Sequence, residues 1–382
     1  MIYLFWISIG ILIYHLIGYG VFLKLLSLFR KSQKTEDIEI KDWPTITVLC
    51  PAFNEADVIE SKINSFLKLD YPPEKIKMIV ISDDSTDGTN EIVSKFTDQN
   101  IELVIQQPRK GKQSGHNLVE PGINSDYVLS TDANSIFKSD SVKKLVRKMY
   151  SHPEIAMVSG ELKFISSAGG DSGEGLYWKY ECWLKSLESI NYSIIGANGS
   201  IFLIRRDLFQ QIHPASVDDF ERTLQVLKKG YIAKYEPEAQ VFEAVTEKPV
   251  EELKRKIRII AQQWFCLERN LQVFNPFSNT RVFLMFFSHK LIRWSLPLFS
   301  ISLFISNFFL ATQPFYFICL LIQLLIYCSG IFEIFLESSG KAIKIFKINA
   351  YFVAMNYSAL IAFVKYISRS QFSTWDTIRH ND

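Results

Sequence analysis

Apolar residues gather at the two ends of the chain, whereas the middle alternates between apolar and polar stretches. At the N-terminal end, residues 2–23 are apolar or aromatic apart from Ser8 and His15. This run is long enough to cross a hydrocarbon core of about 30 Å. Its basic residues follow the apolar run and do not precede it, which predicts a retained anchor with its C-terminal end in the cytoplasm and not a cleaved signal peptide. The basic residues that follow the apolar run are Lys24, Arg30, Lys31 and Lys34.

The apolar character returns from about residue 281. The pattern predicts an interfacial helix over 279–290, then membrane spans near 291–311 and 314–336. A third apolar stretch, 345–367, is interrupted by lysines and asparagines. That stretch either crosses the membrane or lies partly at its surface, and the sequence favours a crossing only weakly.

Between these ends, from Trp43 to about Asn270, short β-branched runs alternate with amphipathic stretches. The runs predict strands at 46–50, 77–82, 101–106, 126–131, 155–159, 200–204 and 231–235. The amphipathic stretches predict helices at 55–68, 87–96, 113–119, 174–189, 218–229 and 250–270. Such alternation is typical of an α/β fold with a mainly parallel, doubly wound sheet. The predicted organisation is an anchor (1–30), a linker (31–42), a soluble domain (43–278) and a C-terminal membrane region (279–382).

Composition narrows the class of protein. Of the 382 residues, 48% are hydrophobic and 21% charged, which fits a membrane protein with a soluble middle. The net charge of +2 gives no support for a nucleic-acid partner. The five cysteines are odd in number and form no CxxC pair, which predicts reduced thiols and a cytosolic soluble part. The scattered histidines and cysteines offer no zinc-ligand spacing.

Two acidic turns follow predicted buried strands. The first is Asp83-Asp84-Ser85-Thr86-Asp87-Gly88, after the strand at 77–82, and the second is Asp132-Ala133-Asn134, after the strand at 126–131. Ligands bind beyond the carboxyl ends of the strands in open α/β sheets. Carboxylates there suit a nucleotide and the divalent cation that accompanies its phosphates. Taken alone, each turn is more often ordinary turn chemistry, and Asp218-Asp219 before a helix is most often an N-cap.

The two acidic turns indicate a function only as part of an ordered series of motifs. That series is Pro51-Ala52-Phe53-Asn54-Glu55, the Asp83 turn, Lys110-Gly111-Lys112, the Asp132 turn, Gly196-Ala197-Asn198-Gly199-Ser200, Arg205-Arg206 and Val217-Asp218-Asp219-Phe220. In this order and spacing it resembles the inverting family-2 glycosyltransferases with a GT-A fold, over about residues 43–270. The flanking apolar segments resemble those of the membrane-bound, polysaccharide-making members. The resemblance implies that residues 43–278 form a cytosolic GT-A glycosyltransferase domain.

The resemblance implies a donor site for a UDP-sugar. Asp83 matches the aspartate that holds the uracil and ribose end, and Lys112 matches a lysine that lines the nucleotide pocket. Asp132 matches the first aspartate of the DxD motif, which binds Mg²⁺ or Mn²⁺ on the diphosphate. Asn134 stands at the second metal-ligand position with an amide oxygen, and so with one charge fewer. Pro51, Asn54 and Glu55 complete the expected nucleotide-sugar residues. The cation is needed because UDP leaves as an anion.

The resemblance also implies an acceptor side. Asp219 matches the general base that takes the proton of the attacking hydroxyl, as inversion requires. Asp218 is its neighbour, and the choice between the two rests on the motif register. Asn198, Gly199, Asp218 and Trp264 are the expected acceptor or sugar-pocket residues. Processive members carry a QxxRW motif, but here Ala261, Gln262 and Gln263 precede Trp264, so neither the Gln nor the Arg of the motif is in place.

The function that we expect is transfer of a sugar from UDP, with inversion, to a glycan or lipid-linked acceptor in cell-surface polysaccharide synthesis. The resemblance implies an integral protein of the bacterial cytoplasmic membrane, in contact with its lipids and with the soluble domain facing the cytoplasm. Two alternatives remain at this point. One is a polyprenyl-phosphate glycosyltransferase, which shares the fold and the first motifs. The other is an inactive, nucleotide-binding membrane scaffold.

Overall fold

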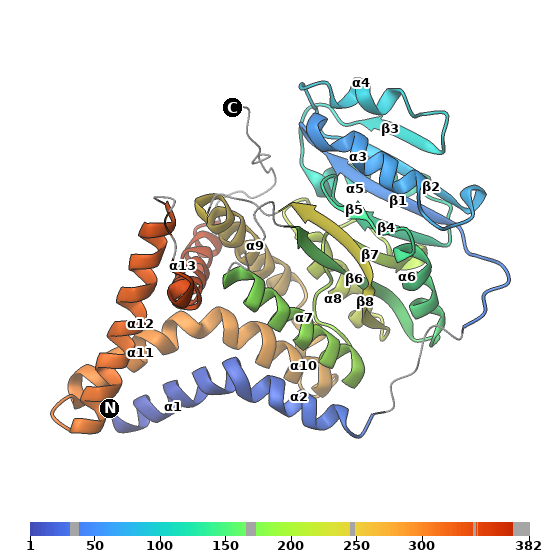
Figure 1. The fold of residues 1–382 in the computed structure, drawn as a ribbon. Coiled ribbons are helices and arrows are strands. Elements are labelled where there is room, and N and C mark those ends of the chain that lie inside the picture. Colours follow the sequence, from blue (N-terminus) through green and yellow to red (C-terminus); the bar gives the residue numbers. More distant parts are fainter. Residues whose placement is uncertain (31–37, 166–172, 245–248, 339–340, 342, 370–382) are drawn as a thin grey trace.

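The computed structural model describes residues 1–30, 38–165, 173–244, 249–338, 341 and 343–369. An α/β unit forms one part of the molecule, and the helices near the two chain ends form a second part beside it (Figure 1). Helices α7 (Gly173–Asn191) and α9 (Pro249–Arg269) lie between the two parts (Figure 1). The α/β unit therefore packs against the apolar helices through α7 and α9.

One eight-stranded sheet organises the α/β unit, in the order β3-β2-β1-β4-β7-β6-β8-β5. The strands are β1 (Ile46–Ala52), β2 (Ile76–Ser82), β3 (Ile101–Ile105), β4 (Tyr127–Thr131), β5 (Ile136–Phe137), β6 (Ile155–Ile165), β7 (Ile201–Arg205) and β8 (Ile232–Ala244). Strands β1 to β4 pair in parallel, as do β6 and β8. Strand β7 runs antiparallel between β4 and β6, and β5 runs antiparallel to β8. The prediction of a mainly parallel sheet is confirmed, with these two strands as antiparallel members.

Helices cover both faces of the sheet because its central strands are buried on both sides. Every residue of β1 is buried. Side chains from α3 (Ala56–Leu67), α4 (Thr89–Ser94) and α6 (Ser141–Tyr150) join the core on one face. Side chains from α5 (Lys112–Val119) and α8 (Asp218–Lys228) join the core on the other.

Parallel pairing brings the acidic turns to one edge of the sheet. Strand β1 pairs with β2 from Ile46↔Ile76 to Ala52↔Ser82, and Ile46 also pairs with Tyr127 of β4. The three strands therefore end at the same edge. The N–H of Asp83 extends this pairing by donating to the Ala52 carbonyl at 2.8 Å. The predicted donor residues thus meet through strand register alone.

The structure adds elements that the pattern did not predict. Helix α6 and the two-residue strand β5 were missed, and β6 and β8 run well beyond the predicted ranges 155–159 and 231–235. Residues 280–291 form α10 (Thr280–Phe286) and a short π-helix, η6 (Phe287–Leu291), which continue directly into α11 (Ile292–Leu310). The predicted helix at 279–290 is thus the first part of one longer helical segment.

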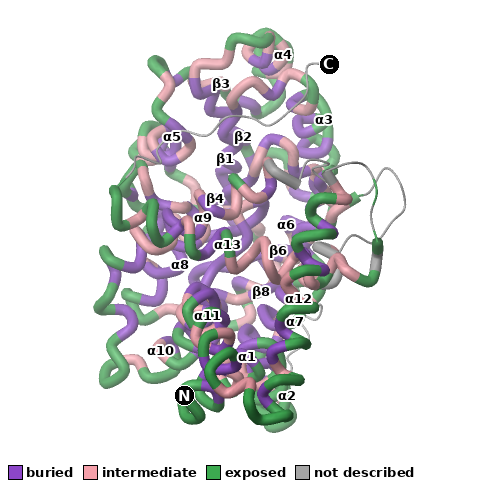
Figure 2. The backbone as a smooth tube through the Cα atoms, turned by 90° about the vertical axis from the view of Figure 1, so that its left-hand side faces the viewer, coloured by how far each residue is buried: buried purple, intermediate pink, exposed green. Residues whose placement is uncertain are grey.

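Within the described residues, four helical segments are long and apolar enough to cross a membrane. They are Ile2–Ser27 (α1, η1 and α2), Thr280–Leu310, Pro314–Glu337 in α12 and Lys347–Ile367, which is α13. Figure 2 shows many exposed positions along α1 and α2, in contrast to the buried strands. Large apolar side chains such as Tyr3, Trp6 and Phe22 are exposed there, as expected of surfaces that face lipid.

Candidate active site

Asp83 ties the first acidic turn to the basic loop that follows β3. Its carboxylate accepts hydrogen bonds from the backbone N–H groups of Lys110 and Gly111, both at 2.9 Å, and from the Gln106 side chain. Gly111 has a φ of 92°, which favours glycine and lets this backbone turn toward the carboxylate. Asp83 thus shapes the loop around it, and its predicted contact with uracil remains a prediction.

The turn after β1 is fastened to the turn after β2. Asn54 has a φ of 51°, and its side-chain oxygen accepts from the Thr86 N–H at 2.9 Å. The N–H of Glu55 donates to the Thr89 hydroxyl at 2.9 Å. Pro51 is buried within β1. The structure therefore brings the predicted nucleotide residues of both turns together at one edge of the sheet.

Lys112, the first residue of α5, joins two carboxylates from distant parts of the chain. Its Nζ donates to Asp132 Oδ1 at 2.8 Å and lies 3.9 Å from Asp218 Oδ2. Burial alone would lower the pKa of Lys112, but the charges of Asp132 and Asp218 outweigh it and raise the pKa above its usual value. Lys112 is therefore a permanent cation, as expected of a residue that meets phosphate.

Asp132 and Asn134 fit a divalent cation that draws its other ligands from a substrate. The side chain of Asp132 is 36% exposed and that of Asn134 is half-buried. Within the described residues, no three His, Cys, Asp or Glu side chains gather as a metal site. Mg²⁺ commonly binds through one or two carboxylates, with phosphate and water oxygens completing its shell. The residues present fit this kind of site and do not form an all-protein cage.

Asp218 is fully engaged by its neighbours. Its oxygens accept from Arg222 Nε at 2.7 Å and from the Ser130 hydroxyl at 3.0 Å. His116 Nδ1 lies 3.6 Å away. Burial would raise the pKa of this carboxyl, but His116, Arg222 and Lys112 hold the pKa well below its usual value. Asp218 is thus a fixed anion that holds α8 against the sheet and α5.

Asp219 has the opposite environment. Its side chain is half-buried, and within the described residues its Oδ1 has no hydrogen-bond partner. Burial raises the pKa of Asp219; the charge of Lys185 opposes this, whereas that of Asp218 adds to it. Asp219 Oδ2 points at Gly199, where a Cβ would lie 3.7 Å from that oxygen. An unengaged carboxylate with a raised pKa is suited to accept a proton.

The remaining predicted acceptor residues lie in two places. The N–H of Asn198 donates to the Ser159 hydroxyl at 2.8 Å, which fixes the turn that carries Gly199. Trp264, on α9 (Pro249–Arg269), packs in an aromatic cluster with Trp294 of α11 at 4.9 Å and Phe363 of α13 at 5.3 Å between ring centroids. Trp264 therefore joins the α/β unit to the membrane helices, and its role toward a sugar remains a prediction.

Sequence reasoning missed two buried charges beneath the Asp132 turn. Lys62 of α3 donates to the Thr131 hydroxyl at 2.7 Å and to the Ser135 carbonyl, and burial lowers its pKa to about 8. Glu243 of β8 accepts from the hydroxyls of Ser135 and Ser200. Burial raises the pKa of Glu243, and the charge of Asp132 adds to this. Lys62 could have been noticed as a lysine on the apolar face of its helix, whereas Glu243 has no comparable signal.

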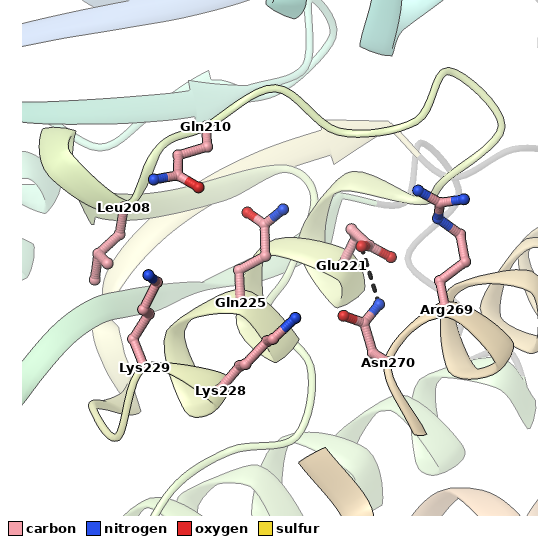
Figure 3. Close-up of a pocket in the computed structure, with 8 residues that line it drawn as sticks. All are labelled: Leu208, Gln210, Glu221, Gln225, Lys228, Lys229, Arg269 and Asn270. Atoms are coloured by element: carbon pink, nitrogen blue, oxygen red, sulfur yellow. Dashed lines mark hydrogen bonds between the residues drawn. The ribbon is translucent and has the colours of Figure 1, made fainter. Parts of the chain in front are cut away.

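A surface pocket of about 330 Å³ lies beside α8 (Figure 3). Its lining is Leu208, Gln210, Glu221, Gln225, Lys228, Lys229, Arg269 and Asn270. In Figure 3, Glu221 and Asn270 face each other, and Asn270 Nδ2 donates to Glu221 Oε1 at 3.0 Å. The lining includes none of the residues predicted for the donor or acceptor, so this pocket is separate from the site described above.

Comparison with known proteins supports the family that the motifs indicate. Residues 47–212 match the model of Glycosyl transferase family 2. The chain is 27% identical over 261 residues to the probable glycosyltransferase YdaM of Bacillus subtilis (strain 168), covering 64% of this chain and 62% of that protein. It is 26% identical over 242 residues to the poly-beta-1,6-N-acetyl-D-glucosamine synthase of Staphylococcus aureus (strain MSSA476), covering 62% of this chain and 58% of that protein. The chain thus spans about 60% of the length of these curated relatives.

A solved structure shares nearly the whole arrangement. The mannosyltransferase PcManGT from Pyrobaculum calidifontis, in complex with GDP-Man and Mn²⁺, superposes with a TM-score of 0.73 over 96% of this chain and 100% of that one. The sequence identity is 20%, so the likeness establishes the fold alone. Residues 47–212 thus match a glycosyl transferase family 2 domain, and the chain has a GT-A fold accompanied by apolar helices at both ends.

Proposed function

We propose that the chain is a membrane glycosyltransferase that moves a sugar from a UDP-sugar, with inversion, to a hydroxyl group of a glycan or lipid-linked acceptor. The observation that carries the proposal is the contrast between Asp218 and Asp219. Asp218 is engaged by Arg222 and Ser130, whereas Asp219 Oδ1 has no partner among the described residues. The site thus holds a carboxylate that is free to act as a base, next to residues suited to a diphosphate.

On the donor side, each residue has a distinct task. The turns at Asn54 and Asp83 form the nucleotide end of the site, and Lys112 supplies a fixed positive charge for the diphosphate. Asp132 and Asn134 would hold Mg²⁺ or Mn²⁺, which neutralises the negative charge that develops on the departing UDP. Lys62 and Glu243 support the Asp132 turn from below through Thr131, Ser135 and their hydrogen bonds.

On the acceptor side, Asp219 takes the proton of the attacking hydroxyl. The new glycosidic bond forms on the face of the sugar opposite UDP, and the proton moves to Asp219 as the bond to UDP breaks. Gly199 leaves room above the carboxylate, because a side chain there would contact Asp219 Oδ2. Asn198 holds this turn through Ser159.

The same proposal places the protein in the bacterial cytoplasmic membrane, with residues 43–278 as its cytoplasmic domain. The apolar segments and the basic residues that flank them support this orientation. The curated relative from Staphylococcus aureus is named for an N-acetylglucosamine polymer. UDP-N-acetylglucosamine is therefore the first donor to test, as part of cell-surface polysaccharide synthesis.

The test is release of UDP by the purified full chain from a panel of UDP-sugars, with GDP-mannose as a comparison donor. We expect release from one UDP-sugar in the presence of Mn²⁺ or Mg²⁺ and none with a chelator. Asp219→Asn should lose this activity, whereas the matched control Asp98→Asn, on an exposed loop, should keep it. Release by the wild type from GDP-mannose alone would overturn the UDP assignment. Activity that survives Asp219→Asn would overturn the assignment of the base.

A further inference from the structure

One face of α7 (Gly173–Asn191) carries buried charges where the α/β unit meets the membrane helices. Glu181, Lys185 and Glu188 are spaced four and three residues apart, so they share this face. Each is less than a tenth exposed. Glu181 pairs with Arg293 at 3.0 Å and with His289 at 3.2 Å, and Glu188 pairs with His289 at 2.8 Å. Glu181 is therefore paired with the arginine of the helical segment Thr280–Leu310, and both glutamates contact His289 of that segment.

Two lysines in the same place have no such partner. Lys185 is 7% exposed and Lys290, in the π-helix η6, is 8% exposed. Within the described residues, no hydrogen bond or ion pair reaches either ammonium group. The ring of Trp178 lies 5.9 Å from Lys185 Nζ and provides a weak contact. Neither Nζ is among the fully enclosed unpaired atoms of the described residues, so both ammonium groups keep some contact with solvent. Two mostly buried lysines whose charges no other residue pairs are suited to bind an anion.

Both lysines lie beside the proposed base. A Cβ at Gly196 would lie 3.8 Å from Lys290 Nζ. Gly196 begins the turn that also carries Gly199, where a Cβ would lie 3.7 Å from Asp219 Oδ2. The charges of Lys185 and Lys290 both act on Asp219. The two lysines belong to α7 and η6, whereas Lys112 belongs to α5 and is already engaged by Asp132. The lysines thus form a second cationic site, distinct from the donor lysine.

We propose that Lys185 and Lys290 bind a phosphate group of a lipid-linked acceptor, and that this contact places the acceptor hydroxyl at Asp219. The inference rests on the proposed function, since it names the acceptor class of that site. The location supports a lipid source, because η6 lies within the apolar segment Thr280–Leu310 and Ser288 in it contacts Tyr14 of the N-terminal segment at 2.8 Å. A phosphate attached to a lipid sits at this level, where membrane helices meet the soluble domain.

The test is binding of farnesyl phosphate, a short isoprenyl phosphate, to the full chain in detergent by titration calorimetry. Farnesol has the same tail without the charge, and inorganic phosphate has the charge without the tail. We expect farnesyl phosphate to bind more tightly than both. Lys185→Gln and Lys290→Gln should each weaken it by about 10- to 100-fold, as expected for a lost charged hydrogen bond. Lys290→Arg keeps the positive charge and should retain most of the wild-type affinity. Lys179→Gln, on an exposed position of α7, should bind farnesyl phosphate as the wild type does.

Binding of UDP with Mn²⁺ is measured in parallel on every variant and reports the donor site independently. If the wild type does not bind UDP, the proposed function is contradicted. If a lysine variant binds UDP as the wild type does, that variant is folded. Farnesyl phosphate affinity that is unchanged in both Gln variants would overturn the anion site. Inorganic phosphate that binds as tightly as farnesyl phosphate would overturn the lipid source.

A separate observation concerns α13 (Lys347–Ile367), which has the length of a membrane span. Both of its ends contact α9. The ring of Tyr351 lies 4.5 Å from Lys256 Nζ, and the Tyr366 hydroxyl donates to Glu268 at 2.9 Å. Helix α9 carries many charges and cannot lie in hydrocarbon. These charged residues are Glu251, Glu252, Lys254, Arg255, Lys256, Arg258, Glu268 and Arg269.

We infer that α13 lies along the membrane surface beneath α9 and does not cross the bilayer. The residues between its two contacts cover on the order of 20 Å along a helix whose partner carries charged residues near both contacts. Its outward positions remain apolar, including Tyr357, Leu360, Val364 and Ile367, which suits a helix half-embedded in lipid. The C-terminal end then stays on the cytoplasmic side together with Arg369, in keeping with the positive-inside bias.

Labelling with a membrane-impermeant maleimide in intact cells tests this topology. Ser368→Cys should react only after the membrane is permeabilised, whereas Gln313→Cys, in the turn between α11 and α12, should react in intact cells. Both positions are exposed in the structure. Labelling of Ser368→Cys in intact cells would show that α13 crosses the membrane.

Discussion

The site has a proposed donor half, at Asp83, Lys112 and Asp132, and a proposed acceptor half, at Asp219, Lys185 and Lys290, and their charged groups have different environments. On the donor half, Asp83 accepts two backbone hydrogen bonds, and Asp132 and Asp218 each contact Lys112. On the acceptor half, Asp219 Oδ1, Lys185 and Lys290 have no hydrogen-bond or ion-pair partner in the described part of the chain. The charges of the proposed donor half are thus already paired within the protein. The charges of the proposed acceptor half are not paired by other described residues, and these are the groups that we assign to the acceptor.

The largest effect is expected from removing the carboxylate of the donor half that faces the diphosphate. Asp132→Ala should lower sugar transfer by about 10³-fold or more, because departing UDP loses the ligand of its cation. Asn134→Asp should keep activity, since it adds a charge at the same place. The measurement is UDP release with and without a chelator. Transfer that is insensitive to both the variant and the chelator would remove the metal from the account.

The next effect separates the two neighbours at the start of α8. Asp219→Asn should lower kcat by about 10²- to 10⁴-fold, which is the usual contribution of a general base. Binding of UDP should stay unchanged, because Asp83, Lys112 and Asp132 are untouched. Steady-state kinetics and calorimetry on the same preparation measure both quantities. A variant that loses UDP binding along with turnover would place Asp219 in the donor half.

Asp218→Asn should instead act on stability. The change leaves Arg222 and Lys112 beside a neutral amide, and breaking a buried ion pair typically costs about 3–5 kcal/mol. We therefore expect a lower Tm, measured by thermal unfolding in detergent, with Asp207→Asn on the exposed surface as control. Normal stability combined with a large loss of kcat would exchange the roles of Asp218 and Asp219.

The smallest effect is a shift in the pH dependence of turnover. The proposed base, Asp219, can accept a proton only when its carboxyl group is deprotonated. Its pKa is raised by burial and by Asp218, against the charges of Lys185, Lys112 and Lys290. Turnover should therefore fall as pH is lowered, at a higher pH than an ordinary aspartate would give. Lys185→Gln removes one opposing cation and should move this fall to still higher pH. A fall that moves to lower pH in this variant would contradict the arrangement.

Much of the donor half could be predicted from the sequence because it depends on local turns and strand register. Asp83 and Asp132 each follow a buried strand, and parallel pairing brings such positions to one edge. The same reasoning predicted the strands themselves. It could not show that β7 runs antiparallel, because a five-residue apolar run has the same pattern in either direction.

The acceptor half depends on contacts between residues far apart in the chain. The sequence showed two adjacent aspartates and left open which is the base. Their difference comes from Ser130 and His116, which meet Asp218 only in the folded domain. Likewise, Lys185 and Lys290 are 105 positions apart, and nothing in either segment indicates that they meet at Asp219. Their burial and their position near Asp219 result from the tertiary fold and could not be predicted from the sequence.

The division into donor and acceptor halves is tested most directly by locating UDP and Mn²⁺ in a structure of the full chain determined by electron cryomicroscopy. We predict that the metal contacts Asp132, that the diphosphate lies next to Lys112, and that Lys185 and Lys290 remain without contact to the nucleotide. A diphosphate bound between Lys185 and Lys290 would contradict the account.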